Sequence, residues 1–490
     1  MNVIKNTTLI DRVLEELQHG LNTCHARPPQ HERPYPAKSV GAVELTDQEQ
    51  KHVAGLMLCK KPARSPANFC RRLVEEFKTF DKPGEPFNLV IRFVGMQGPH
   101  WEKCTEFDIN EHVFYHKPKR NISWLEVKDF AARLHEPPLD RTRPLWEYHV
   151  IDGIEGGRFA VYTKIHHAYA DGVTMADWLN RSLANSADDM ELRPTWTLPG
   201  RRRKKKKKPA QPRLAGTVLK LTSQAWSQVL TTGGIAKLAT QQSLERMGIT
   251  RHAVSVPFSA HGDTPLTGDA TQGRSIATTC LTMKRVKQVC KATRSTLNHV
   301  ALTAIDGGLQ RYLAETGHAI DHPLTIQMPV NLRKNGNDKA GNSVGVILVE
   351  LANPTDDPLA RHQEIGYSLK NAKNQIDSVP GDSIEQYSVI LALTGEMIDK
   401  LHLSNRVPAN GHTLISNLPG PPDPLYLKGA KVEQMCPISI LLPGLRMNIT
   451  LFSVAGILNI GIVSTRDLVE LDRLAVAIED EFQHLESAAL

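Results

Sequence analysis

Apolar positions between residues 39 and 184 follow two alternating periods. Spacings of three and four residues predict helices over residues 124–134 and 173–183, because this spacing gathers apolar side chains on one helical face. Runs of β-branched and aromatic residues predict strands over residues 87–94, 146–151 and 159–165. Three glycines predict a turn between the last two strands: Gly153, Gly156 and Gly157.

The rest of the chain divides into an N-terminal extension, a connector and a second mixed region. Residues 1–38 hold an apolar helical stripe and a proline-rich segment, and residues 185–262 hold a linker followed by a helical hairpin over 214–247. Four segments of residues 263–490 repeat the mixed pattern: strands over 324–330 and 344–351, and helices over 296–313 and 472–485. We therefore expect an α/β protein with two α/β domains, at 39–184 and 263–490.

The positive charge of the chain is local. The net charge is +7, from 59 basic and 52 acidic residues, and eight of the basic residues form one run at 201–208. The remaining 51 basic residues are balanced by the acidic ones. This distribution argues against a broad nucleic-acid-binding face.

Cysteine usage and the absence of long apolar stretches favour a cytoplasmic protein. The seven cysteines show no CxxC spacing, so a disulfide framework or structural zinc site is not expected. We expect no signal peptide and no spanning helix. The longest apolar stretch, residues 449–463, contains several polar residues and glycines and predicts buried strands with a turn. Any membrane contact is therefore expected to be peripheral.

Two adjacent histidines, His166 and His167, close the predicted strand at 159–165, and Asp171 and Gly172 follow in an HHxxxDG pattern. An imidazole can take a proton from a hydroxyl near neutral pH, so we predict that His167 is a general base for acyl transfer. Strand alternation sends His166 to the opposite face. Gly172 is expected to allow a backbone turn that other residues resist.

Each of these residues also has a structural interpretation. A single histidine at a strand end is usually buried and hydrogen-bonded, and only the full pattern favours catalysis by His167. His166 is expected to be mainly structural, with a direct role as the alternative. Asp171 either positions the imidazole, as in a triad, or forms an ion pair that shapes the loop. A metal site is not expected, because adjacent histidines diverge and no HExxH motif is present.

Further motifs accompany HHxxxDG. A stretch at 137–147 contains Pro144, Leu145 and Trp146, and three more motifs follow it: Thr296-Leu297-Asn298, Ser416-Asn417-Leu418-Pro419-Gly420-Pro421 and Met447-Asn448-Ile449. From about residue 106 onward, the sequence resembles the bacterial wax ester synthase/diacylglycerol acyltransferase family. HHxxxDG is shared with other acyltransferases, and the accompanying motifs make the resemblance more specific.

The resemblance implies a fold, a reaction and substrates. The fold would be two chloramphenicol-acetyltransferase-like α/β domains with an interdomain tunnel, in which His167 is the base and Pro144 to Trp146 border the substrate channel. The implied substrates are a long-chain acyl-CoA and a fatty alcohol or diacylglycerol, giving wax esters or triacylglycerol. Acyl-CoA is a co-substrate, and no further cofactor is expected.

Two asparagines are candidates for contact with the substrate. Asn298 either donates a hydrogen bond to the tetrahedral oxyanion or makes a helix-packing hydrogen bond. Asn417 precedes a Pro-Gly turn and either faces the tunnel or belongs to a purely structural turn. Members of the family commonly carry Asn-Asp where this chain has Asn298-His299, so the role of that aspartate is left open.

The basic run and the hairpin after it are candidates for contact with lipid. Such a run is usually a solvated linker, but with lipid substrates it could anchor the protein to an anionic membrane or a lipid inclusion. The hairpin, with Trp226, either dips into the interface or packs on the domains. Two rival functions remain: a condensation-domain-like acyltransferase, and an inactive protein that coats lipid inclusions.

Overall fold

The computed structural model describes residues 35–36, 51–93, 99–170, 172–198, 257–258, 260, 264–331, 344–378 and 381–490. The apolar helical stripe, which spans residues 8–21 of the N-terminal extension, lies outside the described residues, as do the basic run, the hairpin at 214–247 and Asp171. Among the helices that the structure describes, none combines the length and apolar character needed to cross a bilayer.

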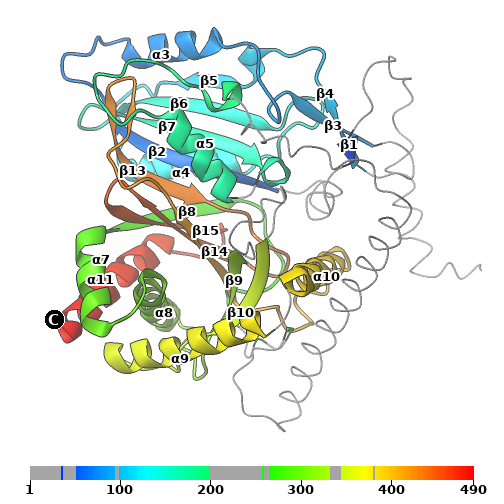
Figure 1. The fold of residues 1–490 in the computed structure, drawn as a ribbon, viewed down its shortest axis with the longest axis vertical. Helices are drawn as coiled ribbons and strands as arrows, with labels where there is room; N and C mark the ends of the chain where they lie inside the picture. The colour runs from blue at the N-terminus through cyan, green and yellow to red at the C-terminus, as the bar shows by residue number, and fades with distance from the viewer. Residues whose placement is uncertain are drawn as a thin grey trace, which may run out of the picture.

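The first large sheet has the strand order β12-β13-β2-β7-β6-β5 (Figure 1). Only β5 and β6 run parallel; the other pairs are antiparallel. Its strands are β2 (His52–Lys60), β5 (Val113–His116), β6 (Trp146–Ile154), β7 (Arg158–His166), β12 (Tyr426–Leu427) and β13 (Ala430–Ile438). Its helices are α3 (Phe69–Lys78), α4 (Trp124–His135) and α5 (Gly172–Ser182).

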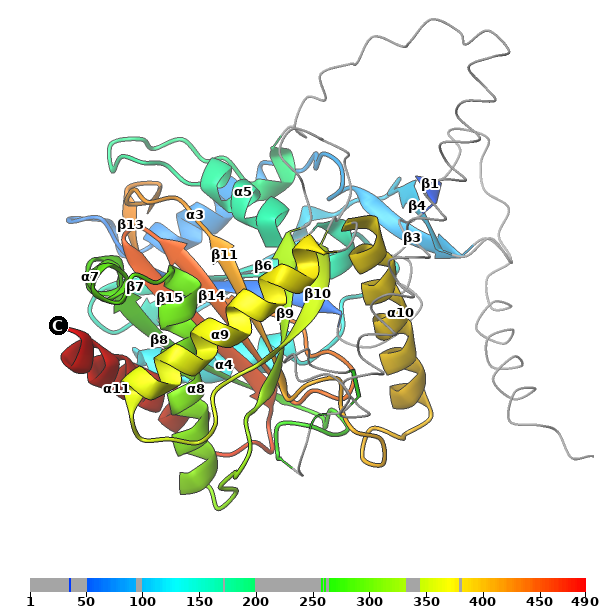
Figure 2. The same ribbon diagram turned by 60° about the horizontal axis from the view of Figure 1, so that its bottom comes forward.

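The second large sheet has the order β10-β9-β11-β14-β15-β8. Its strands are β8 (Arg274–Thr282), β9 (Thr325–Asn331), β10 (Val344–Glu350), β11 (Thr413–Pro419), β14 (Met447–Val454) and β15 (Ile457–Thr465). Its helices are α7 (Met283–Thr293), α8 (Leu297–Glu315), α9 (Pro358–Asp377), α10 (Gly381–Lys400) and α11 (Leu471–Ala489). Both views show α10 to the right of β10 (Figures 1 and 2).

Three short strands form a small separate sheet in the order β1-β4-β3: β1 (Tyr35–Pro36), β4 (Pro99–Lys103) and β3 (Leu89–Phe93). Three 3₁₀ turns complete the described elements: η2 (Ile109–Glu111), η3 (His167–Tyr169) and η4 (Thr195–Thr197). The predicted strand at 87–94 is therefore confirmed as β3, but it belongs to the small sheet and not to a large one.

Local sequence explains where several elements begin and end. Ser123 and Glu126 form a reciprocal capping box at the start of α4, which satisfies two backbone N–H groups. Thr296 caps α8 by accepting a hydrogen bond from the backbone of His299. The predicted pair of strands at 449–463 is confirmed as β14 and β15. Ala455 and Gly456 form their tight turn, with φ of 52° and 77°.

The two halves of the chain share the first sheet. Strands β12 and β13 come from the second half of the sequence, yet β13 pairs with β2 over most of its length. Strand β13 also crosses β15, where the backbone N–H of Met435 donates to Oδ1 of Asn459 at 3.1 Å. Only glycine fits at position 461, where the two strands cross, because a Cβ there would overlap the carbonyl oxygen of Pro437. The domain limits remain predictions, but a cut near residue 263 would not separate the sheets.

Candidate active site

Strand β7 delivers His167 to the space between the two sheets. The strand lies between β2 and β6, and His166 pairs with His52 at its end. Side chains alternate along β7, so Thr163 and Ile165 face the same cavity as His167. His166 is 4% exposed and does not line that cavity.

The turn after β7 is held by its neighbours. The backbone N–H of His167 donates to the carbonyl oxygen of Lys51 at 2.9 Å, and that of His166 to the carbonyl oxygen of Leu145 at 3.0 Å. Nδ1 of His166 accepts from the backbone N–H of Ala168 at 3.2 Å, so this nitrogen carries no proton. His166 therefore acts here as the cap of the η3 turn. These contacts fix the backbone from which the His167 imidazole projects.

Tyr169 ties the same turn to two other segments. Its hydroxyl accepts from the backbone N–H of Leu145 at 2.8 Å and donates to the carbonyl oxygen of Leu89 at 2.5 Å. Leu145 and Trp146 are 0% and 2% exposed, and with Pro144 they lie in the core behind the turn. None of the three lines the described cavity, in contrast to the channel position that the resemblance implied. Among them, Leu145 contacts the histidine turn through its backbone, by hydrogen bonds with His166 and Tyr169.

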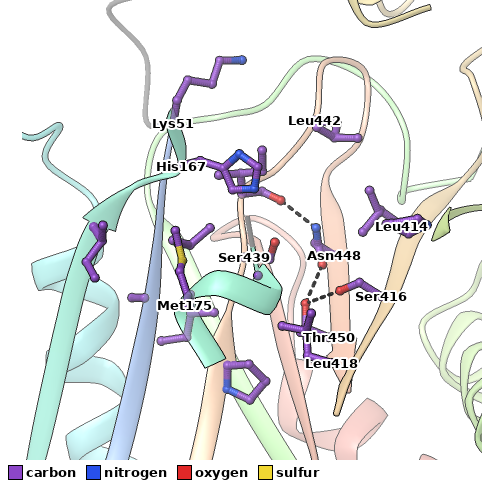
Figure 3. Close-up of a pocket in the computed structure, with 18 of the residues that line it drawn as sticks. Lys51, His167, Met175, Leu414, Ser416, Leu418, Ser439, Leu442, Asn448 and Thr450 are labelled. Atoms are coloured by element: carbon purple, nitrogen blue, oxygen red, sulfur yellow. Dashed lines mark hydrogen bonds between the residues drawn. The ribbon is translucent and has the colours of Figure 1, made fainter. Parts of the chain in front are cut away.

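The cavity has a volume of about 490 Å³ and lies between the two halves. Figure 3 shows the ring of His167 pointing into it. Apolar residues of the first half line it: Val53, Met57, Phe77, Val161, Ile165, Met175, Trp178 and Leu179. Apolar residues of the second half complete the wall: Leu391, Leu414, Leu418, Ile438, Leu442 and Phe452. A lining of this kind suits an extended hydrocarbon chain.

Gly172 is the first residue of α5 and lines the cavity. Its φ is not in the left-handed region, so its backbone is in a conformation that other residues can also adopt. A larger residue would not fit at this position, because its Cβ would lie 2.8 Å from Cδ2 of Leu418 on β11. Gly172 thus permits a close approach between α5 and the second sheet.

The two candidate asparagines contact each other. Nδ2 of Asn417 donates to Oδ1 of Asn298, which joins β11 to the start of α8. Asn417 lines the cavity, whereas Asn298 is exposed to solvent and does not. His299, beside Asn298, stacks on His362 with ring centroids 3.7 Å apart. The arrangement matches the packing interpretation of Asn298.

Polar side chains of the second sheet face the cavity opposite His167. Asn448 and Thr450 alternate along β14, and Ser416 lies opposite Thr450 in register on β11. The hydroxyls of Ser416 and Thr450 are 3.0 Å apart, and Thr450 donates to Oδ1 of Asn448 at 3.2 Å (Figure 3). Asn448 donates from Nδ2 to the carbonyl oxygen of Ile440 at 2.7 Å. This hydrogen-bonded chain is one of the polar features of the wall, which also contains Lys51, Glu396 and Asn417.

An ion pair joins the two halves at the cavity wall. Nζ of Lys51, which precedes β2, lies 2.7 Å from Oε1 of Glu396 on α10, and the two side chains are 5% and 13% exposed. Burial and this geometry make the pair a fixed link between the first sheet and α10. Sequence inspection did not identify this link, because no motif connects residues so far apart in the chain.

The buried histidines behind the histidine turn contribute little positive charge. Burial, and then the neighbouring His135 and Lys164, lower the pKa of His52 well below its usual value. Burial lowers the pKa of Lys164 to about 8, and its ammonium donates to the carbonyl oxygens of Leu134 and Pro137 at 3.0 and 2.5 Å. His52 and His135, whose pKa burial also lowers, are therefore neutral at pH 7.

Comparisons with known proteins give consistent findings. The wax ester synthase/diacylglycerol acyltransferase catalytic domain matches residues 42–301, and the WS/DGAT C-terminal domain matches residues 340–486. The sequence is 31% identical to O-acyltransferase WSD of Acinetobacter baylyi over 90% of this chain and 93% of that protein. It is 33% identical to a probable diacylglycerol O-acyltransferase of Mycobacterium tuberculosis, over 89% and 95%.

Solved structures with a similar fold include a wax ester synthase/diacylglycerol acyltransferase from Marinobacter aquaeolei VT8. The TM-score is 0.70 at 25% identity, and the match covers 93% of this chain and 99% of that one. The first condensation domain of the calcium-dependent antibiotic synthetase matches with a TM-score of 0.55 at 14% identity, over 94% and 97%. The second likeness concerns the fold alone.

Proposed function

Since the chain belongs to the wax ester synthase/diacylglycerol acyltransferase family, we propose that it is an acyl-CoA-dependent O-acyltransferase with His167 as its general base. The acyl donor is a long-chain acyl-CoA, and the acceptor is a fatty alcohol or diacylglycerol. The products are wax esters or triacylglycerol, and CoA is released.

The observation that carries this proposal is the place of the His167 ring. It lines a largely apolar cavity that both halves build, so a thioester and a hydroxyl can meet beside it. The imidazole takes the proton of the acceptor hydroxyl as that oxygen bonds to the thioester carbon. When the carbon–sulfur bond breaks, the imidazolium returns the proton to the departing thiolate. No acyl-enzyme forms in this scheme.

The proposal is tested by thiol release from palmitoyl-CoA, measured separately with 1-hexadecanol and with diacylglycerol. We expect CoA release that depends on an added acceptor and gives the matching ester. Thiol release only with a carrier-bound acceptor would favour a condensation-type enzyme. Lipid binding without any thiol release would identify an inactive coat protein, and either result would contradict the proposal.

We also propose peripheral contact with an anionic membrane or lipid-inclusion surface on the cytoplasmic side. The support is the run of eight basic residues at 201–208, because each cation near an anionic surface contributes about 1 kcal/mol. Replacing these eight residues by a Gly/Ser segment of equal length should weaken binding to phosphatidylserine vesicles and leave turnover of dispersed substrate unchanged. Equal sedimentation of both proteins with the vesicles would contradict the anchor.

A further inference from the structure

Ser416, Thr450 and Asn448 form a chain of hydrogen bonds on the second sheet. The acceptor at its end, the carbonyl oxygen of Ile440, decides which group donates in every bond. The carbonyl oxygen of Ile440 is only an acceptor, so the amide of Asn448 must turn its nitrogen toward it. Oδ1 of Asn448 then faces Thr450, whose hydroxyl has to donate its single proton to that oxygen. Ser416 must in turn donate to the hydroxyl oxygen of Thr450.

These hydrogen bonds leave one N–H of the Asn448 amide for another acceptor. A primary amide carries two N–H groups, and the contacts of Asn448 in the described part of the protein use one of them. Asn448 is 1% exposed, and its side chain lines the cavity that also contains the ring of His167 (Figure 3). A buried N–H that faces such a cavity is a strong donor, because no solvent competes for it.

We infer that the second N–H of Asn448 donates to the thioester oxygen as negative charge develops on it. Asn448 is then a catalytic residue, and Thr450 and Ser416 are positioning residues that orient its amide. This inference rests on the proposed acyl transfer and identifies the oxyanion donor that the sequence left open. Asn298, the other candidate donor, is exposed to solvent and does not line that cavity.

The reaction step balances as follows. The acceptor oxygen bonds to the thioester carbon and gives its proton to His167, while the carbonyl π pair moves onto oxygen beside Asn448. The pair then re-forms the carbonyl, the carbon–sulfur bond breaks, and the thiolate recovers the proton from the imidazolium. The amide keeps its own protons throughout and needs no further reactant.

Asn448→Ala and Asn448→Asp test the inference. Each should lower kcat by about 10²–10³-fold, as expected for loss of one oxyanion donor, and leave the KM for palmitoyl-CoA within about threefold. Thr450→Val should lower kcat less, because the donor remains but its orientation loosens.

The matched control is Thr413→Val. The buried hydroxyl of Thr413 donates to the carbonyl oxygen of Met447 on the same strand pair at 2.9 Å, outside the cavity. This variant should keep normal turnover.

A spectroscopic readout separates the inference from the proposed function. In the His167→Ala protein, a ketone analogue of acyl-CoA with a methylene between sulfur and carbonyl should bind with its carbonyl stretch shifted to lower frequency. Adding Asn448→Ala should remove that shift. An unchanged shift, or an unchanged kcat in an active enzyme, would overturn only the role of Asn448. A wild type that neither binds the analogue nor releases thiol would overturn the proposed function and this inference with it.

Discussion

Replacing His167 by alanine is expected to lower the rate of ester formation by about 10²–10⁴-fold, the usual contribution of a positioned general base. The ring is partly exposed in the cavity, and the contacts that hold the turn come from backbone groups, His166 and Tyr169. The fold should therefore survive the substitution. The measurement is thiol release from palmitoyl-CoA with 1-hexadecanol, together with the unfolding midpoint of the purified variant.

A surface histidine provides the control for this substitution. His484 lies on α11, its side chain is 61% exposed, and it does not line the cavity. His484→Ala should keep the wild-type rate, which excludes a general effect of losing an imidazole. Full turnover by a folded His167→Ala protein would exclude His167 as the base.

Gly461→Ala is expected to destabilise the protein by roughly 1–3 kcal/mol, the usual cost of overpacking a tight core. The new Cβ would overlap the carbonyl oxygen of Pro437, and main chain cannot move aside as a flexible side chain can. Strands β13 and β15 would have to separate, which would also strain the hydrogen bond from Met435 to Asn459. The measurement is the free energy of unfolding in denaturant, with the thermal midpoint as a second probe.

The matched control is a glycine with ordinary space around it. A Cβ on Gly84 would lie 3.8 Å from its nearest neighbour, the carbonyl oxygen of Trp196, and its φ is not left-handed. Gly84→Ala should change the stability by less than about 1 kcal/mol. If Gly461→Ala proved equally mild, the crossing of the two sheets would be looser than the structure indicates.

Periodicity predicted the elements whose burial is one-sided or complete. The strands that become β6, β7, β9 and β10, and the helices that become α4, α5, α8 and α11, are confirmed within a few residues. The sequence could not assign β13 to the first sheet, because its pairing with β2 is set by contacts between residues more than 370 positions apart. Such a pairing leaves no local pattern in either strand.

The candidate site also has one part that the sequence could predict and one part that it could not. The HHxxxDG motif located His167, because the residues of the motif are contiguous in the sequence. The polar chain of Ser416, Thr450 and Asn448 assembles only when β11 and β14 pair. A weak signal existed nonetheless: Asn448 and Thr450 interrupt the apolar run of a buried strand, and buried polar side chains need a partner or a function.

The path of the chain between the sheets limits how substrates can enter. It runs from the first sheet to the second, returns to the first as β12 and β13, and then goes back to the second as β14 and β15. A hinge motion that separates the two halves would therefore require the hydrogen bonds between β13 and β2 to break. We therefore expect a long hydrocarbon chain to enter by small displacements of the segments around the cavity, with the β13–β2 pairing intact.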